Sequence, residues 1–174
     1  MSKVTTAFIA VLAFAAFAGA QETVTQLPAA SLAGVRFLVP NDFPEGPTAL
    51  IIGFTRASRT DTSAWSRQIA QDATLQKSLT LYQVAVLEDI PPLLRHLLIR
   101  SIRSDVPEAQ HGRFLLVTEQ AAAWKALVTY TSADSAYLLL LDATHRIRWR
   151  TSGPRTELSY RALTAAVAAL GEQK

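Results

Sequence analysis

The sequence predicts an α/β domain with a central mixed, mainly parallel sheet flanked by helices, completed by a C-terminal β-hairpin and a helix. Three observations predict this class. An unbroken apolar run at residues 48–55 suits a strand buried on both faces, such runs alternate with helical segments, and two strand patterns lie close together at 137–150. The chain has 174 residues, which is enough for one domain. We place that domain at residues 35–171, after a lead-in at 21–34.

The expected elements follow from the spacing of apolar residues and from turn and capping residues. In the first half they are a strand at 35–39, a strand at 48–55, a helix at 60–71, a strand at 79–87 and a helix at 91–103. In the second half they are a strand at 113–118, a helix at 121–129, strands at 137–142 and 146–150, and a last helix from Thr156. Thr60 or Asp61 is expected to cap the first helix, Ser159 to support Thr156, and Gly171 to form a left-handed cap.

Residues 1–20 have the pattern of a secretory signal peptide. Lys3 gives a positive start, residues 7–17 are uninterrupted apolar residues, and Ala-Gly-Ala at 18–20 is a small-residue cleavage site. The apolar run is shorter than the roughly 20 residues that a membrane span requires. We therefore expect a secreted or periplasmic protein that is cleaved near Ala20, the alternative being an uncleaved anchor.

The chain contains no cysteine. This excludes disulfides, thiolate metal sites, a cysteine nucleophile and a CxxC redox pair. The three histidines, His96, His111 and His145, match no metal-binding spacing, so neither a metal nor another cofactor is expected. No GxSxG motif indicates a hydrolase, and the formal net charge of +3 is too small to indicate a nucleic-acid binder.

Three stretches resemble a known family. They are Leu-Ile-Ile-Gly-Phe-Thr-Arg at 50–56 with Thr-Ser-Ala-Trp at 62–65, Tyr-Leu-Leu-Leu-Leu-Asp at 137–142 with Arg-Ile-Arg-Trp at 146–149, and Ser-Gly-Pro at 152–154. Together they resemble the mitochondrial ATP synthase assembly factor family, within the wider thioredoxin-like superfamily. The resemblance implies a thioredoxin-like fold and the role of a chaperone for subunit a of the proton channel. The signal peptide in place of a mitochondrial transit sequence indicates an exported relative.

The redox site of the thioredoxin-like superfamily is missing from this sequence. In redox relatives the turn after the strand that resembles 48–55 holds the nucleophilic cysteine, and the helix N-terminus lowers its pKa. A cis-proline faces that cysteine in the relatives. Here the turn at 56–62 has no sulfur and the segment 132–136 has no proline. Thiol oxidoreductase activity is therefore not expected.

The turn after the buried strand is the best candidate for a ligand site. Its candidate ligands are Arg56, Ser58, Arg59, Thr60 and Thr62. Guanidinium and hydroxyl groups beside a helix N-terminus, at the carboxyl end of a central strand, can hold a carboxylate or a phosphate. The ordinary alternative is a solvated loop with a helix cap.

The helix expected at 91–103 is amphipathic and basic. One side carries leucines, which we expect to pack on the sheet: Leu94, Leu97 and Leu98. His96, Arg100 and Arg103 lie on another side, where they can meet an anionic membrane surface or an acidic partner. The ordinary alternative is a surface helix packed on the sheet.

Three functions remain open at this point. The leading one is a non-catalytic binding or assembly module with a protein partner, such as a membrane complex, and no nucleic acid. The alternative is a small anionic ligand binder or non-thiol enzyme that uses the turn from Arg56 to Thr62. A reductase that relies on the cysteines of a partner is disfavoured, because the nucleophile must lie on the enzyme to be activated by it. Glu88 and Asp89 are expected to serve in capping and solvation rather than as an acid pair.

Overall fold

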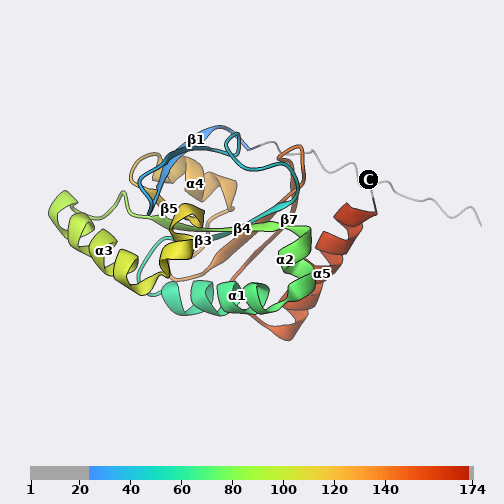
Figure 1. The fold of residues 1–174 in the computed structure, drawn as a ribbon. Helices are drawn as coiled ribbons and strands as arrows, with labels where there is room; N and C mark the ends of the chain where they lie inside the picture. The colour runs from blue at the N-terminus through green and yellow to red at the C-terminus, as the bar shows by residue number, and fades with distance from the viewer. Residues whose placement is uncertain (1–23, 173–174) are drawn as a thin grey trace, which may run out of the picture.

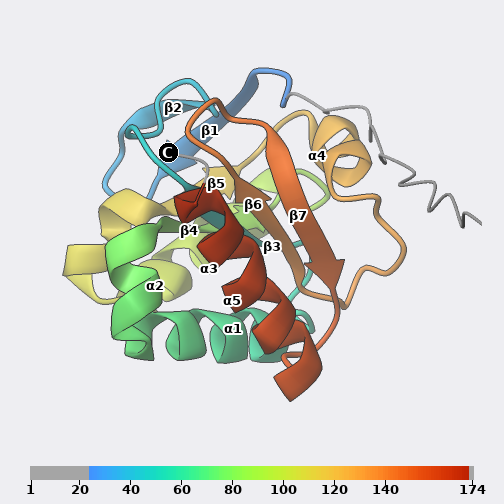
Figure 2. The same ribbon diagram turned by 90° about the vertical axis from the view of Figure 1, so that its right-hand side faces the viewer.

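The computed structural model describes residues 24–172, so the signal peptide predicted at 1–20 lies outside the described residues. The fold is one seven-stranded mixed sheet with helices on both faces (Figures 1 and 2). Its strands are β1 Leu27–Ser31, β2 Arg36–Val39, β3 Thr48–Gly53, β4 Thr80–Val86, β5 Phe114–Val117, β6 Tyr137–Leu141 and β7 Ile147–Ser152. Its helices are α1 Arg59–Gln71, α2 Ala73–Ser78, α3 Pro92–Asp105, the 3₁₀ helix η1 Glu108–Arg113, α4 Ala121–Leu127 and α5 Glu157–Gly171.

The strand order across the sheet is β2-β1-β5-β4-β3-β6-β7. Only the β3–β4 and β4–β5 pairs are parallel, whereas β1–β2, β1–β5, β3–β6 and β6–β7 are antiparallel. The expectation of a mixed sheet is confirmed, but the expectation that it is mainly parallel is wrong. Alternation of strands and helices predicts parallel pairing only within β3-α1-β4-α3-β5, and hairpins supply the strands on either side.

β1 lies inside the segment that the sequence assigns to a lead-in at 21–34. It pairs with β2 in the register Leu27 to Val39 and with β5 in the register Ala30 to Leu116. Its sequence, Leu-Pro-Ala-Ala-Ser, contains residues that are poor strand formers, and the strand exists because two neighbours pair with it. The sheet therefore begins at Leu27 rather than at residue 35.

Two apolar cores lie on opposite faces of the sheet. Successive residues of a strand point to opposite faces, so Ile52 of β3 belongs to the core that contains Trp124 of α4. Ile51 belongs to the other core, which contains Trp65 of α1 and Leu163 of α5. β3 and β6 contribute side chains to both cores and are almost entirely buried. This confirms the prediction that the strand at 48–55 is covered on both faces.

The helix caps predicted from the sequence are confirmed only in part. Thr156 and Ser159 form the expected cap of α5, because each side chain accepts from the backbone N–H of the other. The cap of α1 is not Thr60 or Asp61: the helix starts one residue earlier, and its N-cap Ser58 makes no side-chain capping bond. Gly171 is the last residue of α5 rather than a left-handed cap, and Glu172 after it is right-handed.

α3 is placed differently from the expectation. Leu94 and Leu97, which were expected to pack on the sheet, are 57% and 61% exposed. Leu98 is partly buried, as expected, together with Ile99 and Ile102 of the same helix. No helix within residues 24–172 combines the length and apolar character that crossing a bilayer demands.

Candidate functional site

The candidate turn closes tightly over the end of β3. The hydroxyl of Ser58 donates to the carbonyl of Thr55 at 2.8 Å, and the Ser58 side chain is buried. A Cβ at Gly53 would lie 2.7 Å from the Oγ of Ser58 and 3.2 Å from the Cγ2 of Thr62. Glycine is therefore required at residue 53 because the turn packs directly against it.

Thr55 joins the turn to the segment that precedes β6. Its hydroxyl donates to the carbonyl of Ala133 at 3.2 Å and to the Oδ1 of Asp134 at 2.9 Å. This segment corresponds to the one in which the redox relatives carry a cis-proline. Within residues 24–172 the cis peptide bond is Val39–Pro40, far along the chain from this segment. Hydrogen bonds thus join the turn after β3 directly to the segment before β6.

The structure does not turn the five predicted ligands toward a common point. Ser58 and Thr62 use their hydroxyls on the carbonyls of Thr55 and Arg59, the latter at 3.1 Å. The guanidinium of Arg59 is 2.9 Å from the Oδ2 of Asp105. Of the five predicted ligands, only Arg56 and Thr60 have exposed side chains that make no hydrogen bond or ion pair with the described part of the chain.

An aromatic cluster lies beneath the turn. The ring of Phe54 packs edge-on against Tyr130 and Tyr137, with centroids 5.0 and 5.6 Å apart. The hydroxyl of Tyr137 accepts from the N–H groups of Thr131 and Ser132 at 2.8 and 2.7 Å and donates to the carbonyl of Ser132. Burial raises the pKa of Tyr137, but these hydrogen bonds outweigh it and leave the pKa lowered. The cluster therefore supports the segment before β6.

The other candidate groups have structural partners. Glu88 accepts a hydrogen bond from the N–H of Ala121, at the start of α4, and Asp89 lies 3.1 Å from the Nζ of Lys125. The predicted capping role of Glu88 is therefore confirmed. His111 is half-buried, with its Nε2 2.9 Å from the carbonyl of Val106. Among the described residues no three His, Asp or Glu side chains are grouped as metal ligands.

Asp142 is the polar residue whose importance the sequence reasoning missed. It lies between β6 and β7, and its Oδ1 accepts from the N–H of Thr144, the hydroxyl of Thr144 and the N–H of Arg146 at 2.8, 2.8 and 3.0 Å. Its Oδ2 accepts from the Nε of Arg148 at 2.6 Å. Burial raises the pKa of Asp142, but these bonds outweigh it and lower the pKa to about 2. The Leu-Asp and Arg-Ile-Arg motif is thus the signature of a hairpin turn.

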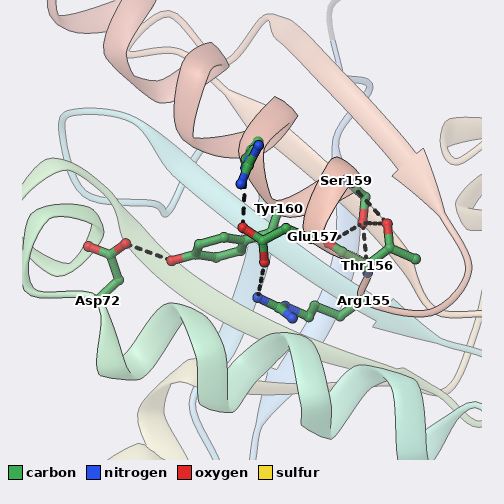
Figure 3. A network of polar contacts seen from close by, with 7 residues as sticks. Asp72, Arg155, Thr156, Glu157, Ser159 and Tyr160 are labelled. Carbon is green, nitrogen blue, oxygen red and sulfur yellow. Dashed lines mark hydrogen bonds and ion pairs between the residues drawn. The ribbon is translucent and has the colours of Figure 1, made fainter.

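A second polar network joins α1, α2 and α5 (Figure 3). The hydroxyl of Tyr160 donates to the Oδ2 of Asp72 at 2.6 Å, while the Oδ1 of Asp72 caps α2 by accepting from two backbone N–H groups. Arg155 and Arg161 both bind Glu157, and the guanidinium of Arg155 lies 5.1 Å from the ring centroid of Tyr160. The network fixes the start of α5 against α2.

A concave surface of the molecule lies away from the turn. A groove of about 270 Å³ opens between α1, α2 and η1, and Leu81 and Gln83 of β4 form its floor. None of the residues from Arg56 to Thr62 lines it. The turn is therefore not part of this groove.

Solved structures with a similar fold include thiol–disulfide oxidoreductases and an assembly protein. The thioredoxin domain of a thiol-disulfide oxidoreductase from Bacteroides vulgatus aligns with a TM-score of 0.59 at 15% identity, covering 84% of this chain and 96% of that one. A DsbF homologue from Corynebacterium diphtheriae aligns with a TM-score of 0.56 at 11% identity, covering 86% and 88%. BsSco, of the Sco family of cytochrome c oxidase assembly proteins, aligns with a TM-score of 0.59 at 6% identity, covering 89% and 96%. The fold is therefore thioredoxin-like.

Family membership rests on the sequence itself. No curated protein matches the chain significantly. A family model described as ATP10 protein matches residues 54–170. This range begins directly after β3, ends in the last turn of α5, and includes all three stretches that carry the resemblance except the start of the first. Because this match spans more than half of its residues, the chain belongs to the ATP10 protein family.

Proposed function

We propose that this protein is an exported assembly factor for the membrane sector of ATP synthase, and that it acts by binding rather than by catalysis. The chain is a member of the ATP10 family, and the observation that carries the proposal is that its turn after β3 holds no group for redox chemistry. The chain has no cysteine, and the hydroxyls of Ser58 and Thr62 are bound to backbone carbonyls inside the turn. A fold without its nucleophile retains its surfaces, and those surfaces are what a binding partner uses.

Deletion of the gene in the source organism tests this function. We expect less fully assembled ATP synthase on native gels, with accumulation of subcomplexes that lack the membrane sector, while the amounts of subunit transcripts stay constant. A plasmid copy should restore assembly, and a copy carrying Arg67→Ala, an exposed change on α1, should restore it equally. Normal ATP synthase in the deletion strain would refute the proposal.

Export is a separate part of the proposal and has its own measurement. The support for it is the charge, apolar run and small-residue pattern of residues 1–20. Protein purified from the envelope should begin at Gln21 when its amino terminus is sequenced. A chain that still begins at its first residue would contradict cleavage and favour the alternative, an uncleaved anchor.

A second candidate function is binding of a small anion at the turn. The observation that favours it is Arg56, which is exposed and makes no ion pair with any described residue. A ligand that binds the native state raises the melting temperature once its concentration exceeds the dissociation constant. Phosphate and short carboxylic acids at millimolar concentration should then raise it, and Arg56→Ala should abolish the rise while Arg67→Ala preserves it. A constant melting temperature across the series would exclude this function.

A further inference from the structure

α3 is the element least integrated into the fold. None of its residues is fully buried. It is held by the partly buried Leu98, Ile99 and Ile102, which pack against a small cluster. Figure 1 shows the helix at the left end of the molecule, beyond the layers formed by the sheet and α1. One long side of α3 is therefore open to solvent.

That open side is apolar over its first two turns. Six large apolar side chains are exposed in the described part of the chain, and three of them belong to α3. These are Leu93, Leu94 and Leu97, which are 85%, 57% and 61% exposed. Residues at i, i+1 and i+4 lie on one side of a helix, so the three leucines form a continuous apolar surface.

The charge around these leucines is positive and is not cancelled by nearby carboxylates. His96 and Arg100 are exposed beside the leucines, and neither makes an ion pair within residues 24–172. The guanidinium groups of Arg95 and Arg103 bind backbone carbonyls rather than carboxylates, so these contacts do not neutralise their positive charge. The one acid of the helix, Asp105, is already paired with Arg59.

The acidic residues before α3 are also engaged. Glu88 accepts from the backbone of α4, and Asp89 binds Lys125 of the same helix. Both carboxylates are therefore committed to α4, and the amino-terminal part of α3 is left with cationic and apolar groups. An anionic surface with an apolar interior complements this combination.

We propose that α3 is a membrane-docking helix that lies on an anionic lipid surface. Leu93, Leu94 and Leu97 enter the boundary between headgroups and acyl chains, and His96 and Arg100 contact lipid phosphates. Helices that lie in this interface combine an apolar face with flanking cations, as α3 does. A purely acidic protein partner would leave the three leucines without a complementary surface. The inference does not depend on ATP synthase being the client.

The absence of cysteine makes a local test straightforward. Leu93→Cys in the full chain provides a single thiol for an environment-sensitive fluorophore, and Leu158→Cys on α5, where the native residue is 81% exposed, provides a matched control. With vesicles of equal parts phosphatidylglycerol and phosphatidylcholine, we expect a blue shift and a severalfold brighter signal at residue 93 and no change at residue 158. Attachment through the apolar residues near the amino terminus does not by itself produce this difference, because the fluorophore reports its own surroundings.

Charge dependence completes the test. Arg100→Glu changes the charge beside the leucines by two units and should weaken the vesicle-induced signal at residue 93 roughly tenfold or more. Vesicles of phosphatidylcholine alone should give little signal, and added salt should reduce the signal on anionic vesicles. The inference is overturned by an unchanged signal at residue 93, by an equal change at residue 158, or by a response to an acidic protein but not to anionic lipid.

Discussion

Gly53 is the residue on which the closure of the turn depends. Because a Cβ at this position would lie 2.7 Å from the Oγ of Ser58, Gly53→Ala forces the turn to move. Overpacking of this kind typically costs about 1–3 kcal/mol of unfolding free energy. We expect a loss in that range in urea unfolding, measured at neutral pH.

A double-mutant cycle shows whether crowding is the cause. Ser58→Ala removes the nearest atom, so Gly53→Ala should be less costly in the Ser58→Ala background than in the native one. Gly112→Ala is the matched control, since no atom lies within 4 Å of a Cβ at that position. Additive losses in the cycle would show that crowding against Ser58 is not the reason for the glycine.

Asp142 should make the stability of the hairpin depend on pH. Its pKa is lowered from 3.8 to about 2, so the carboxylate stabilises the native state above the ordinary pKa, and this contribution is lost as the pH falls toward 2. Asp142→Asn should cost about 2 kcal/mol at pH 7 by urea unfolding. The difference between the two proteins should shrink between pH 4 and pH 2.

Glu119 provides the comparison for Asp142. Its side chain is exposed and accepts no hydrogen bond from any residue that the structure describes. Glu119→Gln should therefore change stability by less than about 0.5 kcal/mol. A difference between native protein and Asp142→Asn that stays constant down to pH 2 would mean that the native carboxylate does not titrate as the hydrogen bonds require.

At the scale of elements, α2 depends on a carboxylate that α5 holds in place. The hydrogen bond from Tyr160 is the main cause of the lowered pKa of Asp72, followed by the bond from the N–H of Leu75. Tyr160→Phe should raise the pKa of Asp72 toward its ordinary value and cost about 1.5–3 kcal/mol, as expected for a hydrogen bond to a charged group. Carboxyl chemical shifts followed against pH, together with urea unfolding, measure both effects. An Asp72 pKa that stays the same in the variant would contradict this account.

Sequence patterns predicted the elements that are rich in apolar residues and missed those that are not. The aliphatic runs of β3 and β6 and the capping pair of α5 are strong local signals. β1 contains proline and alanine and depends on pairing with its neighbours, and α2 has only six residues held by Asp72 and Tyr160. Neither tertiary contact can be seen in a local pattern.

The orientation of α3 could not be predicted for a related reason. Leucine and isoleucine occupy residues 93, 94, 97, 98, 99 and 102, which span most of the circumference of the helix. The pattern therefore predicts a helix without specifying which side packs. The cluster that receives Leu98, Ile99 and Ile102 includes Leu32, which directly follows the unpredicted β1.

At the scale of the whole molecule, the sequence predicted the missing cysteine of the turn better than the partners of the side chains that the turn contains. The missing sulfur is visible in the composition, whereas the bonds that commit Ser58, Arg59 and Thr62 require the coordinates. Candidate ligands close together in sequence were expected to converge on an anion. The fold instead uses the hydroxyls of Ser58 and Thr62 to close the turn, because hydroxyls that are not fully solvated need partners and the nearest carbonyls lie within it, and it pairs Arg59 with Asp105.

The two apolar cores, one on each face of the sheet, are closed by side-chain packing, and the chain has no thiol to cross-link. Nothing in its folding therefore waits for an oxidant, an isomerase of disulfides or a reductant. The folded state should have the same stability in the presence of glutathione or of molecular oxygen.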